Sequence, residues 1–435
     1  MSIAELTDDP HRAWARLRRH GEVVWVAELD GWVTLSRAAG ARVMRDPRRF
    51  TVADPRFSTG RIVGASMLST DGAAHTAHRR PWAEVFKPVA VRDRFTRTLP
   101  EEVAHLLDRL AAAPSPELRS GLAAPLATAA MGAALGLHGL EVGQVLAWYR
   151  AIVAGVEAVS RGGDPPPAAR QAVAAIRDHV QRTLQGPPGD TVLSAAAAGG
   201  GADPGRLSAD LAILLFGGVD TAESMTGIAA HHLLTHPDAL EQVRADPALL
   251  AGAIQESLRL EPAATRVDRY ATTDAELAGA RIRAGDLVIV CLSAANRDPD
   301  VFSDPDRYDI RRDNAADHLA FAIGPHHCLG VHLTTLQTTL ALGMLLERFP
   351  DIHAAGWPAA PRTTAAPPPI RCASHARQCR RPPAGAEEAH PADASGTERR
   401  PVSAGGPASA AADRHGRVVG CGGRPAPATD RAGGG

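Results

Sequence analysis

Residues 321–330 read FAIGPHHCLG, and this stretch decides what fold and what chemistry the chain is expected to have. One cysteine, Cys328, lies between Gly324 and Gly330, directly before the helix-patterned run VHLTTLQTTLALGMLLERF. The free N–H groups and the positive end of a helix at that point stabilise a thiolate. The two glycines allow the backbone to approach a flat ligand closely. The pattern favours an axial thiolate ligand of haem iron, although a lone cysteine is more often a small buried hydrophobic residue.

Composition limits the class of protein. The 435 residues carry a formal net charge of -1 and show no basic stripe with interleaved aromatics, which argues against nucleic acid as a partner. The N-terminus is charged throughout and no apolar run approaches the length of a membrane span, so we expect a cytoplasmic protein without a membrane segment. Only Cys291 and Cys328 occur before residue 356, which excludes a disulfide framework there. Apolar periodicity continues without a linker to about residue 356, which predicts one large domain over 1–356.

Most of that domain has a helical pattern. The segments VVWVAEL and WVTLS, joined by Asp30-Gly31, predict a β-hairpin, and residues 275–294 predict further short strands. Segments 51–70 and 161–167 are polar or rich in Gly and Pro and predict mobile loops. Helices are predicted over 73–87, 91–113, 118–137, 141–160, 168–184, 208–235, 238–245 and 248–260 and after Cys328. The expected class is mainly α with small β-sheets.

The longest predicted helix, capped by Ser208, contains Gly217 and Gly218 in its middle. Each mid-helix glycine costs about 1 kcal/mol relative to alanine. A glycine pair beside a threonine that can bond a carbonyl one turn back predicts a distortion and a widened groove. The adjacent Asp220 and Thr221 could then relay protons. The alternative is that Asp220 is a solvated helix charge in a glycine-rich chain.

Two further pairs of charged or titratable side chains stand at helical spacing. Glu256 and Arg259 lie on one face of an otherwise apolar helix, so a buried pair whose arginine takes carbonyls from loop 297–312 is one reading and a weak surface pair is the other. His75 and Arg79 lie at i and i+4 and would suit a cofactor with two carboxylates. An exposed cationic face is the alternative.

Taken together, FAIGPHHCLG, QESLR, GGVDT, HTAHR and NRDPDVFSDPDRYD resemble the cytochrome P-450 superfamily in its soluble bacterial form, over residues 10 to about 352. The resemblance implies a triangular prism with haem b between the long central helix and the cysteine-loop helix. It implies that Cys328 is the haem-iron ligand and that Glu256 and Arg259 support the cysteine loop. By the same resemblance, the residues that contact the haem or its carboxylates are His75, Arg79, Arg269, His326 and Gly330, and the oxygen groove consists of Gly217, Gly218, Asp220 and Thr221.

The implied function is a haem-thiolate monooxygenase that uses O2 to hydroxylate or epoxidise a hydrophobic small molecule of secondary metabolism. No flavin or iron–sulfur motif is present, so electrons would come from a separate ferredoxin and ferredoxin reductase. Met67, Leu215, Phe216 and Ala264 are the expected substrate-pocket residues. The alternative is a haem-binding protein without productive turnover, as a sensor or a C-terminally damaged enzyme.

The chain also departs from the family pattern. Ala322 stands where the cysteine loop usually has glycine, and Val331, Thr334, Thr335 and Gln337 change the helix that follows. After Trp357 there is no Phe, Tyr, Trp, Leu or Met, so residues 357–435 are predicted to be a disordered tail. A frameshift that replaced the authentic C-terminus is our hypothesis for that tail. A zinc site at Cys372, His375 and Cys379 is a weaker alternative.

Overall fold

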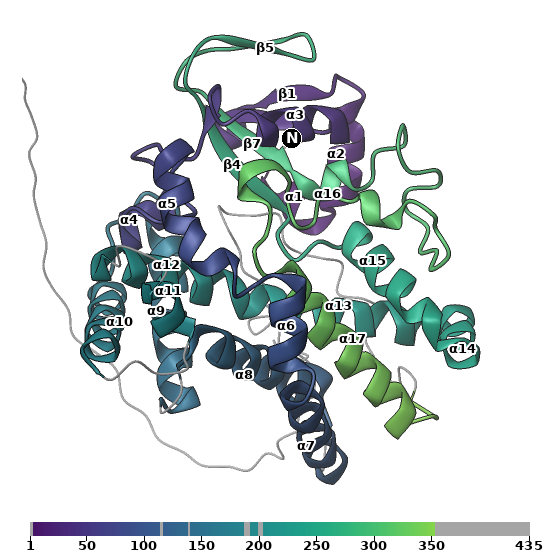
Figure 1. Cartoon of the computed structure of the whole chain (residues 1–435). Coiled ribbons are helices and arrows are strands. Elements are labelled where there is room, and N and C mark those ends of the chain that lie inside the picture. Colours follow the sequence, from purple (N-terminus) through teal and green to yellow (C-terminus); the bar gives the residue numbers. More distant parts are fainter. Residues whose placement is uncertain (1–2, 114–115, 138–139, 187–191, 199–202, 353–435) are drawn as a thin grey trace, which may run out of the picture. The chain divides into compact units, whose positions relative to one another are not determined.

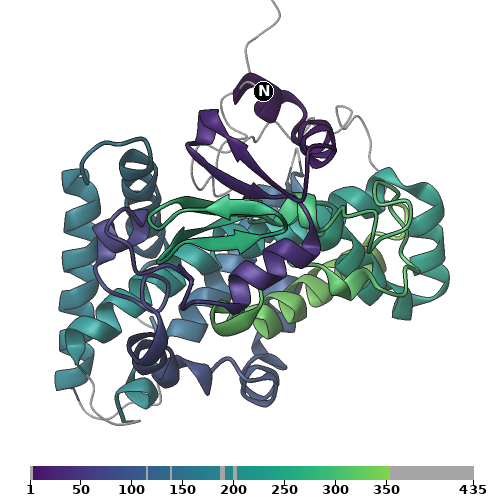
Figure 2. The ribbon, with the colours of Figure 1, turned by 90° about the horizontal axis from the view of Figure 1, so that it is seen from above.

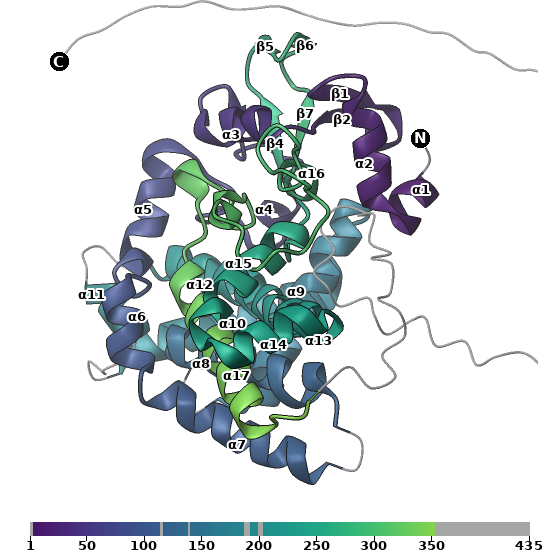
Figure 3. The same cartoon turned by 90° about the vertical axis from the view of Figure 1, so that its right-hand side faces the viewer.

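The computed structural model describes residues 3–113, 116–137, 140–186, 192–198 and 203–352. All of these belong to a unit that spans Met1–Arg380. The predictions for residues 357–435 lie outside the described residues. Figures 1 and 3 show the larger sheet with α2, α3 and α16 at one end of the described chain and α7 and α8 at the other.

Helices dominate, as the sequence predicts. The helices that precede the long central one are α1 (Ile3–Asp8), α2 (Pro10–Arg18), η1 (Ala27–Leu29), α3 (Arg37–Arg45), α4 (Ser58–Val63), α5 (Gly72–Ala83), α6 (Pro88–Phe95), α7 (Thr98–Ala112), the π-helical turn η2 (Arg119–Ala123), α8 (Ala124–Leu135), α9 (Val142–Ser160), α10 (Pro167–Gln185) and α11 (Val192–Ala198). The later ones are α12 (Pro204–Gly218), α13 (Asp220–Thr235), α14 (Pro237–Ala245), η3 (Pro247–Leu249), α15 (Leu250–Leu260), α16 (Leu292–Ala295), η4 (Ala315–Asp317), η5 (Gly324–His326) and α17 (Val331–Arg348). Figures 1 and 2 show α9 and α10 side by side at the left-hand edge, where they pack against each other.

The strands form one mixed sheet of five strands and one small hairpin. The sheet has the order β1-β2-β7-β4-β3, with β1 (Val23–Val26), β2 (Gly31–Thr34), β7 (Leu287–Cys291), β4 (Arg266–Ala271) and β3 (Phe50–Thr51). Among the strand pairs of the described residues, only β2–β7 is parallel. The predicted hairpin β1–β2 is confirmed, and Asp30 adopts the left-handed conformation in its turn (φ 47°). β5 (Ala275–Leu277) and β6 (Ala280–Ile282) make the separate hairpin.

The long helix begins earlier than predicted and is interrupted. It starts at Pro204, and the carboxylate of Asp203, not Ser208, caps it by accepting the N–H of Gly205. The Ser208 hydroxyl instead donates to the carbonyl oxygen of Pro204 (2.5 Å). The prediction that residues 51–70 are only loop is also wrong, because they contain the short helix α4 and the end of β3.

Two helical segments are long and apolar enough to cross a bilayer by length and composition, α9 and the combined span Pro204–Thr235. This is weak evidence for a membrane segment, because core helices pass the same test and 61% of the second window is buried. The main hydrophobic core of the protein contains much of α12 and α13. Helix α13 packs against both α15 and α17. The packing brings the interruption of the long helix, the Glu-x-x-Arg helix and the cysteine-loop helix together.

Candidate functional site

The cysteine loop is built around two backbone constraints. Cys328 lies between η5 and α17, and its N–H donates to the carbonyl oxygen of Phe321 (2.8 Å), which closes the loop. Gly324 has φ 76°, and a Cβ there would lie 2.5 Å from the backbone oxygen of Met44. Only glycine fits that position. Gly330 is the N-cap residue of α17, so the sulfur stands at a helix N-terminus as predicted.

Opposing effects act on the Cys328 thiol. Burial is the largest effect and raises the pKa of the thiol overall, whereas three groups oppose that rise: the N–H groups of Gly330 and Val331, which donate to the sulfur, and the positive charge of Arg79. These groups all stabilise a negative sulfur. These three groups would help to hold the sulfur as a thiolate when it binds a metal ion.

The predicted carboxylate-binding residues lie together beside this loop. The rings of His75 and His326 are 4.3 Å apart between centroids, and Nη2 of Arg79 donates to the carbonyl oxygen of His327 (2.5 Å). His75 is buried, its Nε2 has no partner in the described part of the chain, and burial lowers its pKa to about 4. Arg269, on β4, is 5% exposed. Within the described part of the chain its guanidinium makes a single hydrogen bond, from Nη1 to the backbone oxygen of Asp268 (2.7 Å). Unused buried donors of this kind fit the carboxylates of haem.

The structure adds Asp71, the N-cap residue of α5, to this group. The Asp71 carboxylate accepts from Thr51 Oγ1 (2.6 Å) and from the N–H of Val52 (2.9 Å), and it lies 2.8 Å from Nε2 of His326. Burial acts to raise the pKa of Asp71, but the bonds from His326, Thr51 and Val52 lower it to about 2. Asp71 therefore ties the start of α5 to the cysteine loop.

The predicted distortion of the long helix is confirmed. α12 ends at Gly218, Val219 has φ −86° and ψ −71°, and α13 begins at Asp220. Oγ1 of Thr221 donates to the carbonyl oxygen of Gly217 at 2.5 Å, one turn back. Asp220 is 6% exposed, and its Oδ2 has no partner among the described residues. An acid and an alcohol thus stand at the break.

The two glycines of the break have different surroundings. A Cβ on Gly217 would meet nothing within 4 Å, so this residue faces open space. A Cβ on Gly218 would lie 2.5 Å from the sulfur of Met131 on α8, so Gly218 serves close helix packing. Gly217, not Gly218, therefore faces the space in which the groove is predicted.

The residues predicted to line a substrate pocket differ in how exposed they are, as the two glycines do. Leu214, Gly217 and Thr221 share the accessible face of the helix, whereas Leu215 is fully buried in the core. Leu215 and Leu214 differ in exposure because neighbouring residues of a helix point about 100° apart, and the assignment of Leu215 to a substrate pocket stays a prediction. Phe216 and Met67 are 5% and 6% exposed, and Ala264 lies in a partly exposed segment before β4.

Glu256 and Arg259 form the buried pair that the sequence predicted. Both side chains are completely enclosed, with Nε to Oε2 at 2.7 Å and Nη2 to Oε1 at 2.8 Å. Arg259 also donates to the carbonyl oxygens of Asn296, Pro305 and Arg307, which confirms the predicted role of loop 297–312. Arg312 was not predicted; its Nε donates to Oε1 of Glu256 (3.0 Å).

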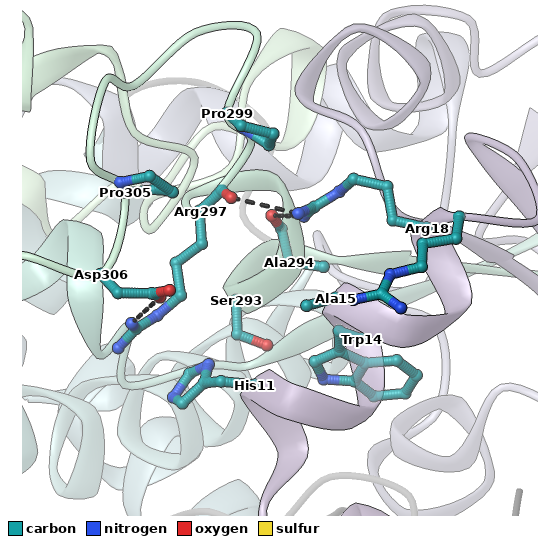
Figure 4. Close-up of a pocket in the computed structure, with 11 residues that line it drawn as sticks. His11, Trp14, Ala15, Arg18, Ser293, Ala294, Arg297, Pro299, Pro305 and Asp306 are labelled. Carbon is teal, nitrogen blue, oxygen red and sulfur yellow. Dashed lines mark hydrogen bonds and ion pairs between the residues drawn. The ribbon is translucent and has the colours of Figure 1, made fainter.

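A pocket of about 340 Å³ lies elsewhere, between α2, α16 and the 297–306 segment (Figure 4). Arg18 crosses it and donates to the carbonyl oxygens of Ala294 and Arg297, and Arg297 pairs with Asp306. None of its lining residues belongs to the cysteine loop or the groove. It is a cavity beside the segment that holds Arg259, and it shares no side chain with the site described above.

Comparisons of this sequence with known proteins agree with the geometry of the site. The cytochrome P450 family model matches residues 190–351. Cytochrome P450 monooxygenase PikC from Streptomyces venezuelae is 34% identical over 364 residues, which cover 79% of this chain and 85% of PikC. The 6-deoxyerythronolide B hydroxylase from Saccharopolyspora erythraea is 32% identical over 369 residues, covering 79% of this chain and 89% of the hydroxylase.

Solved structures agree. P450BioI, in complex with an acyl carrier protein ligated to hexadec-9Z-enoic acid, has a TM-score of 0.75 at 26% identity, over 82% of this chain and 96% of that chain. The ligand-free P450 monooxygenase TamI has a TM-score of 0.69 at 29% identity, over 81% of this chain and 87% of that chain. The similarity thus covers 96% and 87% of the two solved chains, and 82% and 81% of this one.

Proposed function

This chain belongs to the cytochrome P450 family and is a P450 monooxygenase, and we propose that it hydroxylates or epoxidises a hydrophobic small molecule of secondary metabolism. The relatives include 6-deoxyerythronolide B hydroxylase and 20-oxo-5-O-mycaminosyltylactone 23-monooxygenase, both from bacteria. We further propose cytoplasmic localisation and electron supply by a separate ferredoxin and ferredoxin reductase. Support for the external donors comes from the sequence, where no flavin or iron–sulfur motif occurs.

Haem b is the proposed cofactor, and the residues present fit it. Cys328 would hold the iron through its sulfur, while Arg79, Arg269, His75 and His326 would bind the propionates. Bound there, the thiolate-ligated iron supplies the activation of O2 that lets one oxygen atom enter the substrate. Glu256 and Arg259 would act away from the cofactor, by fixing the segment that leads to the cysteine loop.

The observation that carries a turnover function is the break between α12 and α13. Oδ2 of Asp220 is buried without a partner among the residues that the structure describes, and Oγ1 of Thr221 lies one residue on, beside open space at Gly217. An unpaired buried carboxylate oxygen costs about 1–3 kcal/mol, so its retention favours a working proton donor or acceptor. In the proposed relay, Asp220 holds a proton at Oδ2 and Thr221 passes it from Oγ1 into the groove. A haem carrier without turnover, the alternative function, has no use for this relay.

Two measurements test the proposal. The reduced, CO-bound protein should show the absorption band that names the family, and Cys328→Ser should lose it while the fold is retained. NADPH consumption with a surrogate ferredoxin and reductase should then depend on added substrate. A chain that shows the CO band but consumes NADPH at one rate across a broad substrate panel would support the non-catalytic alternative.

A further inference from the structure

A buried titratable pair, His78 and Asp210, lies outside the groups used above. Asp210, on α12, has no exposed surface, and His78, on α5, is 6% exposed. Nδ1 of His78 lies 2.9 Å from both carboxylate oxygens of Asp210. Oδ1 of Asp210 also accepts the backbone N–H of Met67 at 2.8 Å. One carboxylate thereby joins α12, α5 and the loop between α4 and α5.

That loop, residues 64–71, is otherwise bonded mainly to itself. Within it, Thr70 Oγ1 donates to the oxygen of Ser66 (2.7 Å), and Ser69 Oγ donates to the oxygen of Gly64 (3.2 Å). Its far end is fixed by the Asp71 bonds to β3 and to the cysteine loop. Among the hydrogen bonds of the described residues, the Met67–Asp210 bond is the one that ties the middle of the loop to α12.

The position of Asp210 on α12 indicates what the Met67–Asp210 hydrogen bond does. Residues four and seven positions further along a helix share its face, and for Asp210 these are Leu214 and Gly217. Leu214 and Gly217 are on the accessible face beside the helix break. Asp210 therefore attaches the loop to the helix face that also carries Leu214 and Gly217.

A buried carboxylate is energetically unfavourable unless other groups hydrogen-bond to it. Burial raises the pKa of Asp210, and the bonds from His78 and Met67 oppose that rise. Two buried apolar side chains would often be as stable as a buried ion pair. The pair's retention in a core therefore favours a role in holding a particular geometry.

We propose that Asp210 is a positioning residue that fixes the middle of loop 64–71 as a wall of the substrate site, with His78 as its buried partner. The inference rests on the proposed function for the identity of that site as the substrate site. The loop governs how readily a small molecule reaches the iron and how tightly it is held. Without the tie, loop 64–71 opens at its centre while its Asp71 end stays attached.

Hydrogen exchange and imidazole binding test the proposal in the haem-loaded protein. Asp210→Ala should speed amide exchange in a peptide spanning 64–71 by about tenfold or more, because a buried N–H loses its acceptor. Imidazole association, followed by the shift of the haem absorption band, should accelerate in the same variant. Asp210→Asn keeps an acceptor for Met67 and should stay close to wild type. Asp178→Asn, an exposed change on α10, is the matched control.

The double variant His78→Leu/Asp210→Leu separates positioning from general packing. It replaces both buried polar side chains with apolar ones, so the unfolding midpoint should be near that of wild type, yet exchange in 64–71 and imidazole association should remain fast. Wild-type exchange and association rates in this variant would overturn the proposal. If Asp210→Ala does not fold, the double variant alone decides. Failure to find turnover with any substrate would count against the proposed function and leave these two readouts intact.

Discussion

At the scale of single residues, the substitution of Ala322 for the usual glycine has a visible cost. Ala322 has φ 53°, in the left-handed region, and its N–H bonds to the oxygen of Leu319 (2.9 Å), which holds that conformation. A residue with a Cβ pays about 1–2 kcal/mol there. Glycine would suit this left-handed conformation better than alanine does.

Ala322→Gly should therefore raise the free energy of unfolding by about 0.5–1 kcal/mol, since relief of the strain exceeds the added chain entropy of glycine. Denaturant unfolding of the haem-loaded protein measures this. Ala278→Gly is a matched control in an exposed hairpin turn with φ 48°. It should give a similar gain without changing haem retention. A gain at 278 and none at 322 would mean that the cysteine loop is not strained.

Thr221→Ala should uncouple the enzyme. The proposed relay loses its hydroxyl, so reductant is consumed and peroxide released while product falls by roughly a hundredfold or more, the usual range for a proton-transfer group. Peroxide and product are measured per NADPH. Thr235→Ala removes a comparable hydroxyl, bonded to the oxygen of His231 (2.7 Å) at the far end of α13, and should leave coupling unchanged. Unchanged coupling in Thr221→Ala would assign proton delivery to Asp220 alone.

At the scale of elements, the helices predicted best are those with both a periodic pattern and clear end signals. α10 and α14 each begin with a proline and match their predictions within one residue. β4 was not predicted, because RVDRYA does not alternate apolar and polar residues and is fixed by pairing with β7. The start of α12 was missed because Asp203-Pro204 lies before the apolar pattern begins.

The break between α12 and α13 predicts opposite effects for neighbouring glycines. Gly217→Ala should stabilise the protein by up to about 1 kcal/mol, because the added methyl enters open space and alanine favours helix. Gly218→Ala should destabilise it, because Met131 must move away. Paired denaturant titrations measure both changes, and Gly217→Ala should also narrow the groove and weaken substrate binding. Equal shifts for the two variants would contradict the assignment of separate roles.

At the scale of the whole molecule, acid sensitivity should come partly from a buried neutral histidine. His318 accepts the N–H of Ala320 at Nδ1 (3.1 Å), and its Nε2 lies 3.0 Å from Oε1 of Gln255. Burial, with Arg259 and Arg37 adding to it, lowers the pKa of His318 to about 4. The unfolded chain takes up this proton below pH about 6.5, whereas the folded chain does so only near pH 4. The stability is thus complete above about 6.5 and is lost as the pH falls toward 4.

The free energy of unfolding should accordingly fall by up to about 1.4 kcal/mol per pH unit through this group between pH 6 and 5. Urea titrations at pH 7.5, about 6 and about 5 measure the slope. His318→Phe keeps a ring against Phe321 and should flatten it, whatever its absolute stability. His20→Phe, at an exposed position, should keep the wild-type slope. Parallel slopes for His318→Phe and wild type would refute the assignment.

Much of the candidate site could be predicted from the sequence because its residues lie in short local patterns. Cys328 with its glycines, Glu256 with Arg259, and Thr221 behind Gly217 each show their relation within a few residues. Asp210 and His78 are 132 positions apart, and Asp71 and His326 are 255 apart. Neither partner has a local pattern that names the other, so only the folded chain brings these pairs together.

The enclosed Glu256–Arg259 pair also limits how this sequence can evolve. Removing one partner leaves the other as an uncompensated buried charge, at about 3–5 kcal/mol. That is a large share of the roughly 5–15 kcal/mol that stabilises a typical domain. Removing both still strands the carbonyl oxygens of Asn296, Pro305 and Arg307 that Arg259 occupies. Single-step drift is therefore blocked at both positions, and a lineage can leave this arrangement only by rebuilding a whole segment at once.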